Sequence, residues 1–266
     1  MNFDNDSSSA LNHYKLNQKP SEIKSVSLSK KLNEISGLAS TNDGRIFCHT
    51  DEEGTVFQID PSSGEIIKTF SLGQKKVRED FEGIAISKNF FYLVSSGGDI
   101  YRFNEGKNEE KVNYKIYKTP LGSIFDVEGL CYDRETNSLL LACKEFAGKD
   151  LKDKRAVYSF SLNKMKLNEK PRFLLSIKKI EEAIDKNVFS PSGIERHPKT
   201  GTFFLITGKG KAIVEISKDG RVLAEENLKD EIHKQPEGVT FLPDLTMLIS
   251  DEAAGGKATL TKYPYY

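Results

Sequence analysis

A short motif that occurs five times along the chain constrains the fold more than any other feature. Each copy has serine or glutamate, then glycine, then leucine, isoleucine or valine. The glycines are Gly37, Gly83, Gly129, Gly193 and Gly238, and successive glycines lie 46, 46, 64 and 45 residues apart. Because three of the four intervals agree within one residue, the sequence predicts one structural unit that is used five times.

The residues after each motif predict a four-stranded sheet. A turn rich in Gly, Asn, Asp or Pro comes first, and an apolar strand follows it, at residues 45–51, 90–96, 138–145, 202–208 and 245–252. A third strand is expected in every copy and a fourth in most copies. Short runs of β-branched and aromatic residues between such turns indicate antiparallel sheets. A four-stranded repeat of this length is typical of a propeller blade. The predicted fold is therefore an all-β, five-bladed β-propeller.

The two ends of the chain bear on how the ring closes. The fifth copy has room for only three strands before the sequence ends at Tyr266. Residues 21–28 alternate in the manner of a strand, so we expect them to supply the missing outer strand and protect the sheet edges. The predicted domain is one propeller over residues 21–266. Residues 1–20 are polar and rich in Ser and Asn, which predicts a disordered leader. Residues 177–187 have helical composition and predict a short exposed helix.

Composition narrows the classes of function and of partner. The 39 basic and 39 acidic residues balance, so nothing favours nucleic acid as a partner. No apolar run approaches the roughly 18 residues that span a bilayer, and no signal peptide is present as written. The residues alone leave both an exported protein and a cytoplasmic one open. Cys48, Cys131 and Cys143 fall inside predicted strands, which favours buried free thiols over a disulfide framework or a zinc site.

The residue before each repeated glycine is the main candidate for function. The first strand of a propeller blade lines the central channel, so these five side chains should converge on one axis. They are Ser36, Glu82, Glu128, Ser192 and Glu237. Three converging carboxylates repel one another, so either some of them are protonated or a cation lies among them. Because every candidate ligand is an oxygen, we expect calcium at Glu82, Glu128 and Glu237, ahead of magnesium or manganese. The alternative is that the glutamates accept backbone hydrogen bonds or hold ordered water.

Further polar residues are expected to line the same channel. Residues two apart in a strand share a side, which adds the acidic positions Glu34, Asp80 and Asp126 to the ring. The ends of the second strands should lie near a channel mouth and add Asp51, Lys144 and Asp251. Lys144 would there form an ion pair with the carboxylates or bind an anion.

These motifs resemble the bacterial SdiA-regulated propeller family, a distant relative of NHL-repeat proteins. The resemblance rests on the Glu-Gly or Ser-Gly start of each blade and on the segment LISDEAAG at residues 248–255. It covers residues 21–266, and the order Ser, Glu, Glu, Ser, Glu in the ring is its most specific part. The resemblance implies a five-bladed propeller, a calcium site and an exported setting in the periplasm or cell envelope. It implies no established activity.

Two functions follow, and the sequence leaves open whether the protein is an enzyme. The first is a monomeric, calcium-stabilised module that binds a small molecule or a protein over the channel mouth. The second is a metal-dependent hydrolase of a lactone or a phosphate ester, as among related six-bladed propellers, although the two ring serines depart from the lactonase pattern. The second needs a general base near the metal. His233, four residues before Glu237, is the candidate base, with Glu128 or Asp126 as alternatives.

Overall fold

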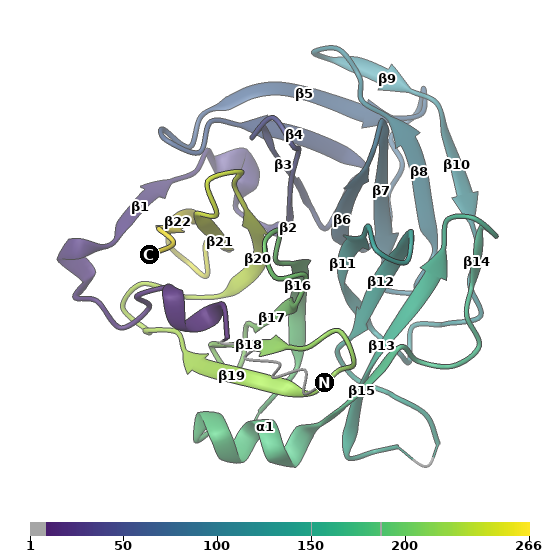
Figure 1. Cartoon of the computed structure of the whole chain (residues 1–266). Helices are drawn as coiled ribbons and strands as arrows, with labels where there is room; N and C mark the ends of the chain where they lie inside the picture. Colours follow the sequence, from purple (N-terminus) through teal and green to yellow (C-terminus); the bar gives the residue numbers. More distant parts are fainter. Residues whose placement is uncertain (1–8, 150, 187) are drawn as a thin grey trace, which may run out of the picture.

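The chain folds as the predicted five-bladed, all-β propeller. The computed structural model describes residues 9–149, 151–186 and 188–266. Five sheets surround a central axis, and their innermost strands meet near the centre of the ring (Figure 1). Most blades have four antiparallel strands. Among the described residues there is one α-helix, α1 (Ile177–Ile184), which lies within the predicted helical segment. Residue 187 of that segment lies outside the described residues.

Each blade runs from an inner strand at the axis to an outer strand at the rim. The innermost strands are β2 (Ile35–Ser40), β6 (Phe81–Ser87), β11 (Val127–Asp133), β16 (Pro191–Arg196) and β20 (Pro236–Phe241). The second strands are β3 (Ile46–Thr50), β7 (Phe90–Ser95), β12 (Ser138–Cys143), β17 (Phe203–Thr207) and β21 (Met247–Asp251). The third strands are β4 (Thr55–Ile59), β8 (Ile100–Asn104), β13 (Lys154–Ser161), β18 (Ala212–Ile216) and β22 (Thr259–Tyr263).

The outer positions are less regular than the inner ones. The outer strands are β5 (Ile66–Leu72), β10 (Tyr114–Tyr117), β15 (Phe173–Ser176), β19 (Val222–Asn227) and β1 (Lys24–Ser27). Two short strands are added, with β9 (Glu110–Val112) parallel to β5 and β14 (Lys166–Leu167) antiparallel to β13. Three 3-10 turns lie in the N-terminal part, at η1 (Leu11–His13), η2 (Pro20–Glu22) and η3 (Lys30–Leu32).

The last blade combines strands from both ends of the chain. Strand β1 pairs antiparallel with β22, from Lys24 opposite Lys262 to Ser27 opposite Thr259. The sheet therefore runs β1-β22-β21-β20 from rim to axis. The N-terminal segment thus supplies the outer strand of the blade that contains the C-terminal strands (Figure 1).

The expectation of a disordered leader is wrong for residues 9–16. The side chains of Ala10, Leu11, Tyr14 and Leu16 are buried against the fourth and fifth blades. The Ser9 hydroxyl and the Leu11 N–H both donate to Oε2 of the buried Glu215, at 2.5 and 2.8 Å. The segment is polar on average, but its four apolar side chains are spaced so that all of them reach the same surface. Their burial therefore orders the segment despite its composition. Residues 1–8 of that prediction lie outside the described residues.

The hydrophobic core is divided among the spaces between neighbouring blades. Five clusters of buried apolar side chains fill these spaces, each drawing residues from two adjacent blades. Between the first two blades, for example, Phe47 and Phe70 pack against Phe91 with their rings edge-on. The three cysteines are buried free thiols, as predicted. No helix in the described parts of the chain is long and apolar enough to cross a membrane.

Candidate functional site

A β-bulge at the start of every inner strand directs one side chain toward the axis. In each blade the register between the first and second strands shifts at the repeated motif, for example between Phe81 and Gly83. The residue left without a partner is the one before each glycine. Bulges redirect side chains in this way and are frequent near functional sites. The bulged residues are Ser36, Glu82, Glu128, Ser192 and Glu237.

The repeated glycines bring the five inner strands close together. A Cβ atom on any of them would lie 2.5–3.2 Å from a backbone atom of the next inner strand. On Gly193, for example, it would lie 2.5 Å from the backbone oxygen of Glu237. None of the five has a positive φ, so close approach rather than unusual backbone conformation explains the glycine. The narrow ring that results places the bulged side chains around one point.

The bulged side chains line a single small cavity on the axis. The cavity is lined by the three residues of each repeated motif, which include the bulged residues Ser36, Glu82, Glu128, Ser192 and Glu237. Its volume is about 10 Å³, roughly enough for the centre of one water-sized sphere. The predicted convergence of the three glutamates is therefore present in the fold.

The three glutamates are in a setting that disfavours their ionised form. Burial and the neighbouring charges of Glu128 and Asp80 raise the pKa of Glu82 to about 10. Burial and the charges of Glu128 and Glu252 raise the pKa of Glu237 to about 8. Burial also raises the pKa of Glu128, although Lys144 opposes this. At neutral pH these shifts favour the protonated forms of Glu82 and Glu237.

Lys144 supplies positive charge to the ring. Its Nζ lies 2.6 Å from Oε1 of Glu128, and only 7% of the Glu128 side chain is exposed. Burial alone would lower the pKa of Lys144, but the bond to Glu128 and the charges of Glu128, Asp126 and Glu237 together outweigh burial and raise the pKa. Of the two roles expected for Lys144, the structure shows the ion pair.

Acidic side chains from several blades gather at the mouth next to this ring. Glu34 and Asp80 are exposed there, while Asp51 and Asp126 are partly buried. Burial, followed by the charge of Glu34, raises the pKa of Asp51. Burial, followed by the charges of Glu34 and Asp51, raises the pKa of Glu252 to about 7. Glu252 follows β21 directly. Its position just after the end of a second strand is therefore the feature of the sequence that could have identified it.

His233 and Asp251 lie in the core rather than at the channel mouth, so their predicted positions are wrong. Both side chains are at most 1% exposed. His233 Nδ1 lies 2.8 Å from Asp251 Oδ2, and its Nε2 lies 2.7 Å from the Tyr263 hydroxyl. With both ring nitrogens occupied, His233 cannot serve as a base at the channel mouth. Asp251 also accepts the backbone N–H of Gln235 at 3.2 Å, so this group fixes the start of β20.

The ring provides oxygen donors, but its present partners are protein groups. The Ser192 hydroxyl donates to the backbone oxygen of Pro236 at 2.8 Å, and Gln235 donates to Glu237 Oε1 at 3.2 Å. Within residues 9–149, 151–186 and 188–266, no three His, Cys, Asp or Glu side chains form a group placed to hold a metal ion. The donor atoms of the ring are all oxygens, the type that hard cations prefer, but such an ion would have to displace Lys144 from Glu128 and draw the carboxylates together.

Comparison with known structures places the fold among propellers. Glutaminyl cyclase of Myxococcus xanthus has a TM-score of 0.58 at 12% identity, over 92% of this chain and 96% of that chain. A protein of unknown function from Bacteroides thetaiotaomicron has a TM-score of 0.54 at 15% identity, over 85% of this chain and 58% of that one. Virginiamycin B lyase of Staphylococcus aureus has a TM-score of 0.47 at 12% identity, over 87% of this chain and 66% of the lyase. At these identities the likeness concerns the fold alone.

Comparison with sequence families gives a more specific result. No curated protein matches the chain. The family model described as SdiA-regulated matches residues 166–263, which include the fourth and fifth copies of the repeat. The resemblance read from the repeated motifs is thus confirmed, and over residues 166–263 this five-bladed propeller matches the SdiA-regulated family.

Proposed function

We propose that the protein is a calcium-binding propeller that recognises a ligand or partner over the acidic mouth of its channel. The observation that carries the proposal is the convergence of Glu82, Glu128 and Glu237 on one axial cavity through matched bulges. Gathering three carboxylates in this way costs free energy unless protons or a cation compensate it. A calcium ion would supply two positive charges to all three groups at once.

The number of available donors leaves room for a ligand. Calcium takes six to eight oxygen ligands in flexible geometry. The ring offers three carboxylates and the hydroxyls of Ser36 and Ser192. If the two serine hydroxyls keep their hydrogen bonds to backbone oxygens, some coordination positions of the ion stay open toward the mouth. A ligand with its own oxygen atoms would complete the coordination there, so the ion would link stability to recognition.

Calcium titration of ring variants tests the metal site. Calorimetry of the wild-type protein should show one calcium per chain, and Glu82→Gln or Glu128→Gln should weaken binding at least about tenfold, because each removes a charged ligand. Glu65→Gln is the matched control, since Glu65 is exposed on the turn between β4 and β5. The proposal would be contradicted if calcium gave no binding heat and if neither calcium nor a chelator changed the melting temperature.

Lys144 provides a second, opposite test. Its ammonium group must leave Glu128 Oε1 before an ion can bind that oxygen. Lys144→Ala should therefore lower the melting temperature of the metal-free protein and enlarge the increase that calcium produces, because bound ligand stabilises by mass action. Thermal unfolding with and without calcium measures both effects. An unchanged or smaller calcium effect in Lys144→Ala would argue that the lysine is the permanent counterion of the ring.

A metal-dependent hydrolase is the second candidate, and Glu252 is the observation that favours it. This partly buried carboxyl group lies near the ring and has its pKa raised to about 7 by burial first and by Glu34 next. A general base works best with a pKa near the working pH. Calcium-dependent turnover of lactones or phosphate esters that Glu252→Gln removes, and that Glu65→Gln keeps, would support it. Binding of calcium without turnover of any such substrate would leave the binding module as the function.

A further inference from the structure

A second and larger cavity lies at the opposite end of the channel. It has a volume of about 560 Å³, within the range of small-molecule sites, and all five blades contribute to its lining. Its walls are the C-terminal ends of inner strands and the turns that follow them. The carboxylate ring is at the other ends of the same strands, so the two sites do not share residues.

Small side chains create the space on the axis. Ala39 and Ala85, two residues after the repeated glycine in the first two blades, line the cavity. The third and fifth blades carry cysteine and threonine at this position, whereas the fourth carries Glu195. Oε1 of Glu195 accepts the backbone N–H of Arg196 at 2.7 Å. Burial raises the pKa of Glu195 to about 8, although that hydrogen bond opposes the effect. Near neutral pH this carboxyl group can therefore donate a proton to an acceptor in the cavity.

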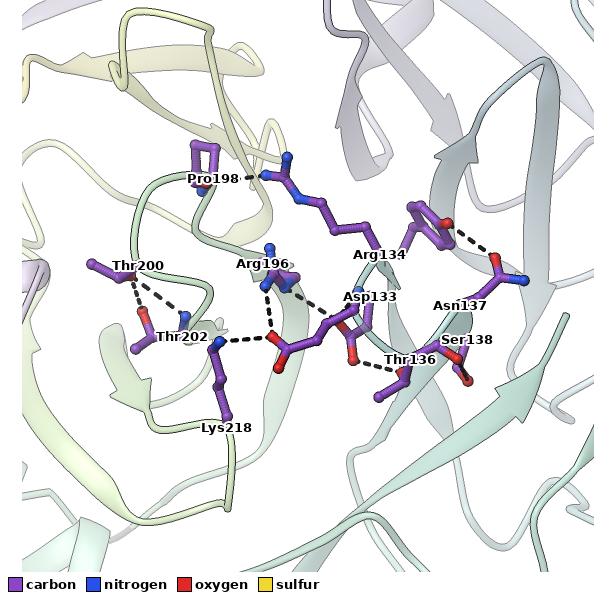
Figure 2. Close-up of polar contacts among 12 residues, drawn as sticks. Asp133, Arg134, Thr136, Asn137, Ser138, Arg196, Pro198, Thr200, Thr202 and Lys218 are labelled. Carbon is purple, nitrogen blue, oxygen red and sulfur yellow. Dashed lines mark hydrogen bonds and ion pairs between the residues drawn. The ribbon is translucent and has the colours of Figure 1, made fainter.

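Two of the four cationic side chains in the lining are paired with carboxylates. Arg45 Nε lies 2.9 Å from Asp43 Oδ2, and its Nη1 lies 2.5 Å from Glu105 Oε1. Arg196 Nε lies 3.1 Å from Oδ1 of Asp133 at the end of β11 (Figure 2). Its Nη2 lies 3.2 Å from Oε2 of Glu135 in the β11–β12 turn. The bonds of Arg45 to Glu105 and of Arg196 to Asp133 and Glu135 connect neighbouring blades, whereas Asp43 and Arg45 share one turn. The charges of both arginines are largely neutralised.

The other two cations have no carboxylate partner among the described residues. Arg134 extends from the β11–β12 turn to the backbone oxygen of Pro198, which its Nη2 meets at 3.1 Å (Figure 2). Lys88 makes no hydrogen bond or ion pair with any residue that the structure describes. Both side chains line the cavity. An anion inside it would therefore meet two positive charges that form no ion pair with a described carboxylate, although the charge of Arg134 also acts on Glu195 in the same lining.

We propose that this cavity binds a small organic anion, with a carboxylate or phosphate head group held by Lys88 and Arg134 and an apolar body packed on the cavity wall. Tyr132, Phe241 and Pro243 supply that wall. The head group fits the sign of the unpaired charges, and the mixed lining suits an amphiphilic molecule. The opposite mouth is acidic, so the two ends of the channel select ligands of opposite charge. The proposal does not depend on the calcium site.

Probes of similar shape and different charge test this inference on the full chain. Benzoate, phenyl phosphate and benzamidine are titrated by ligand-observed NMR, with and without calcium. We expect at least one of the two anions to bind, benzamidine not to bind, and calcium to leave the anion affinity unchanged. The tighter anion identifies the preferred head group. Lys88→Glu and Arg134→Glu should each weaken the anion at least about tenfold, because each removes a charged hydrogen-bond donor.

Two controls distinguish loss of a specific binding site from a general change in surface charge and from loss of folding. Lys24→Glu changes the same charge on the exposed outer strand β1 and should leave anion binding as in the wild-type protein. Lys88 is exposed and contacts no described partner, so Lys88→Glu should keep the wild-type melting temperature. Failure of both anions to bind at millimolar concentration, equal binding of benzamidine, or equal anion affinity in Lys88→Glu, Arg134→Glu and Lys24→Glu would each overturn the proposal.

Discussion

Glu82 shows at the scale of one residue what the ring requires. Its carboxyl group is partly buried and faces the other acidic side chains, and burial with the charges of Glu128 and Asp80 raises its pKa to about 10. In an unfolded chain the same group has a pKa near 4.5. Between these two values the folded protein holds a proton that the unfolded chain has released.

The metal-free protein should therefore lose stability as the pH rises from about 4.5 toward 10. The slope from one such group is at most about 1.4 kcal/mol per pH unit. Glu82→Gln should flatten this slope, since glutamine does not titrate. Calcium should flatten it too, because the ion replaces the proton and releases it to the buffer. Denaturant unfolding in chelator at several pH values measures the slope. A steeper slope in Glu82→Gln than in the wild-type protein would contradict this account.

The ring was predictable from the sequence, whereas the position of His233 was not. The five motif copies define equivalent positions, and equivalence in a ring implies convergence, which holds for Glu82, Glu128 and Glu237. His233 has no such repeat. Its partners Asp251 and Tyr263 lie 18 and 30 residues further along the chain. His233 precedes β20, Asp251 ends β21 and Tyr263 ends β22, so the contact depends on the pairing of all three strands. Sequence spacing does not reveal that contact.

The inner strands show at the scale of the element why glycine follows the bulge. Each strand approaches the next so closely that a methyl group on any of the five glycines would meet backbone atoms of the next inner strand, in addition to nearby side chains. Glycine at such a position permits either close backbone approach or an unusual φ, and the sequence does not decide between the two. The structure shows close approach. The bulge itself had no sequence signal, because one unpaired residue looks the same as a paired one.

Gly193→Ala should destabilise the propeller. The added Cβ would lie 2.5 Å from the backbone oxygen of Glu237, so the two blades must separate. Such overpacking costs about 1–3 kcal/mol or more. Gly122→Ala is the matched control, because a Cβ there meets nothing within 4 Å and its φ is not positive. Urea unfolding should show a lower midpoint for the first variant and little change for the second. Equal midpoints would show that neighbouring inner strands can move apart without loss of stability, which would contradict this prediction.

The N-terminal segment has a structural role that its polar composition did not indicate. Deletion of residues 1–16 removes the buried side chains of Leu11, Tyr14 and Leu16 from the surface between the fourth and fifth blades. Each large apolar side chain contributes roughly 1.5–3 kcal/mol when buried. The deletion should therefore lower the free energy of unfolding by several kcal/mol. A chain without residues 1–8 is the control for the truncation itself. An unchanged unfolding midpoint after deletion of residues 1–16 would support a dispensable leader instead.

At the scale of the whole molecule, the channel has two ends of different character. One end carries the carboxylate ring and an acidic mouth, and the other carries the larger cavity with Lys88 and Arg134. The sequence indicated the first end through its repeat. It gave no sign of the second, because the cavity is lined by residues that differ from blade to blade and share no motif. Function at that end therefore depends on turns, which the repeat does not constrain.

A crystal structure of the protein, from crystals grown with calcium and measured with anomalous diffraction, tests the proposed axial calcium site most directly. One anomalous peak is expected on the propeller axis, coordinated by oxygens of Glu82, Glu128 and Glu237, with Lys144 moved away from Glu128. A well-ordered axis that holds only water, with the Lys144–Glu128 ion pair intact at high calcium concentration, would contradict it.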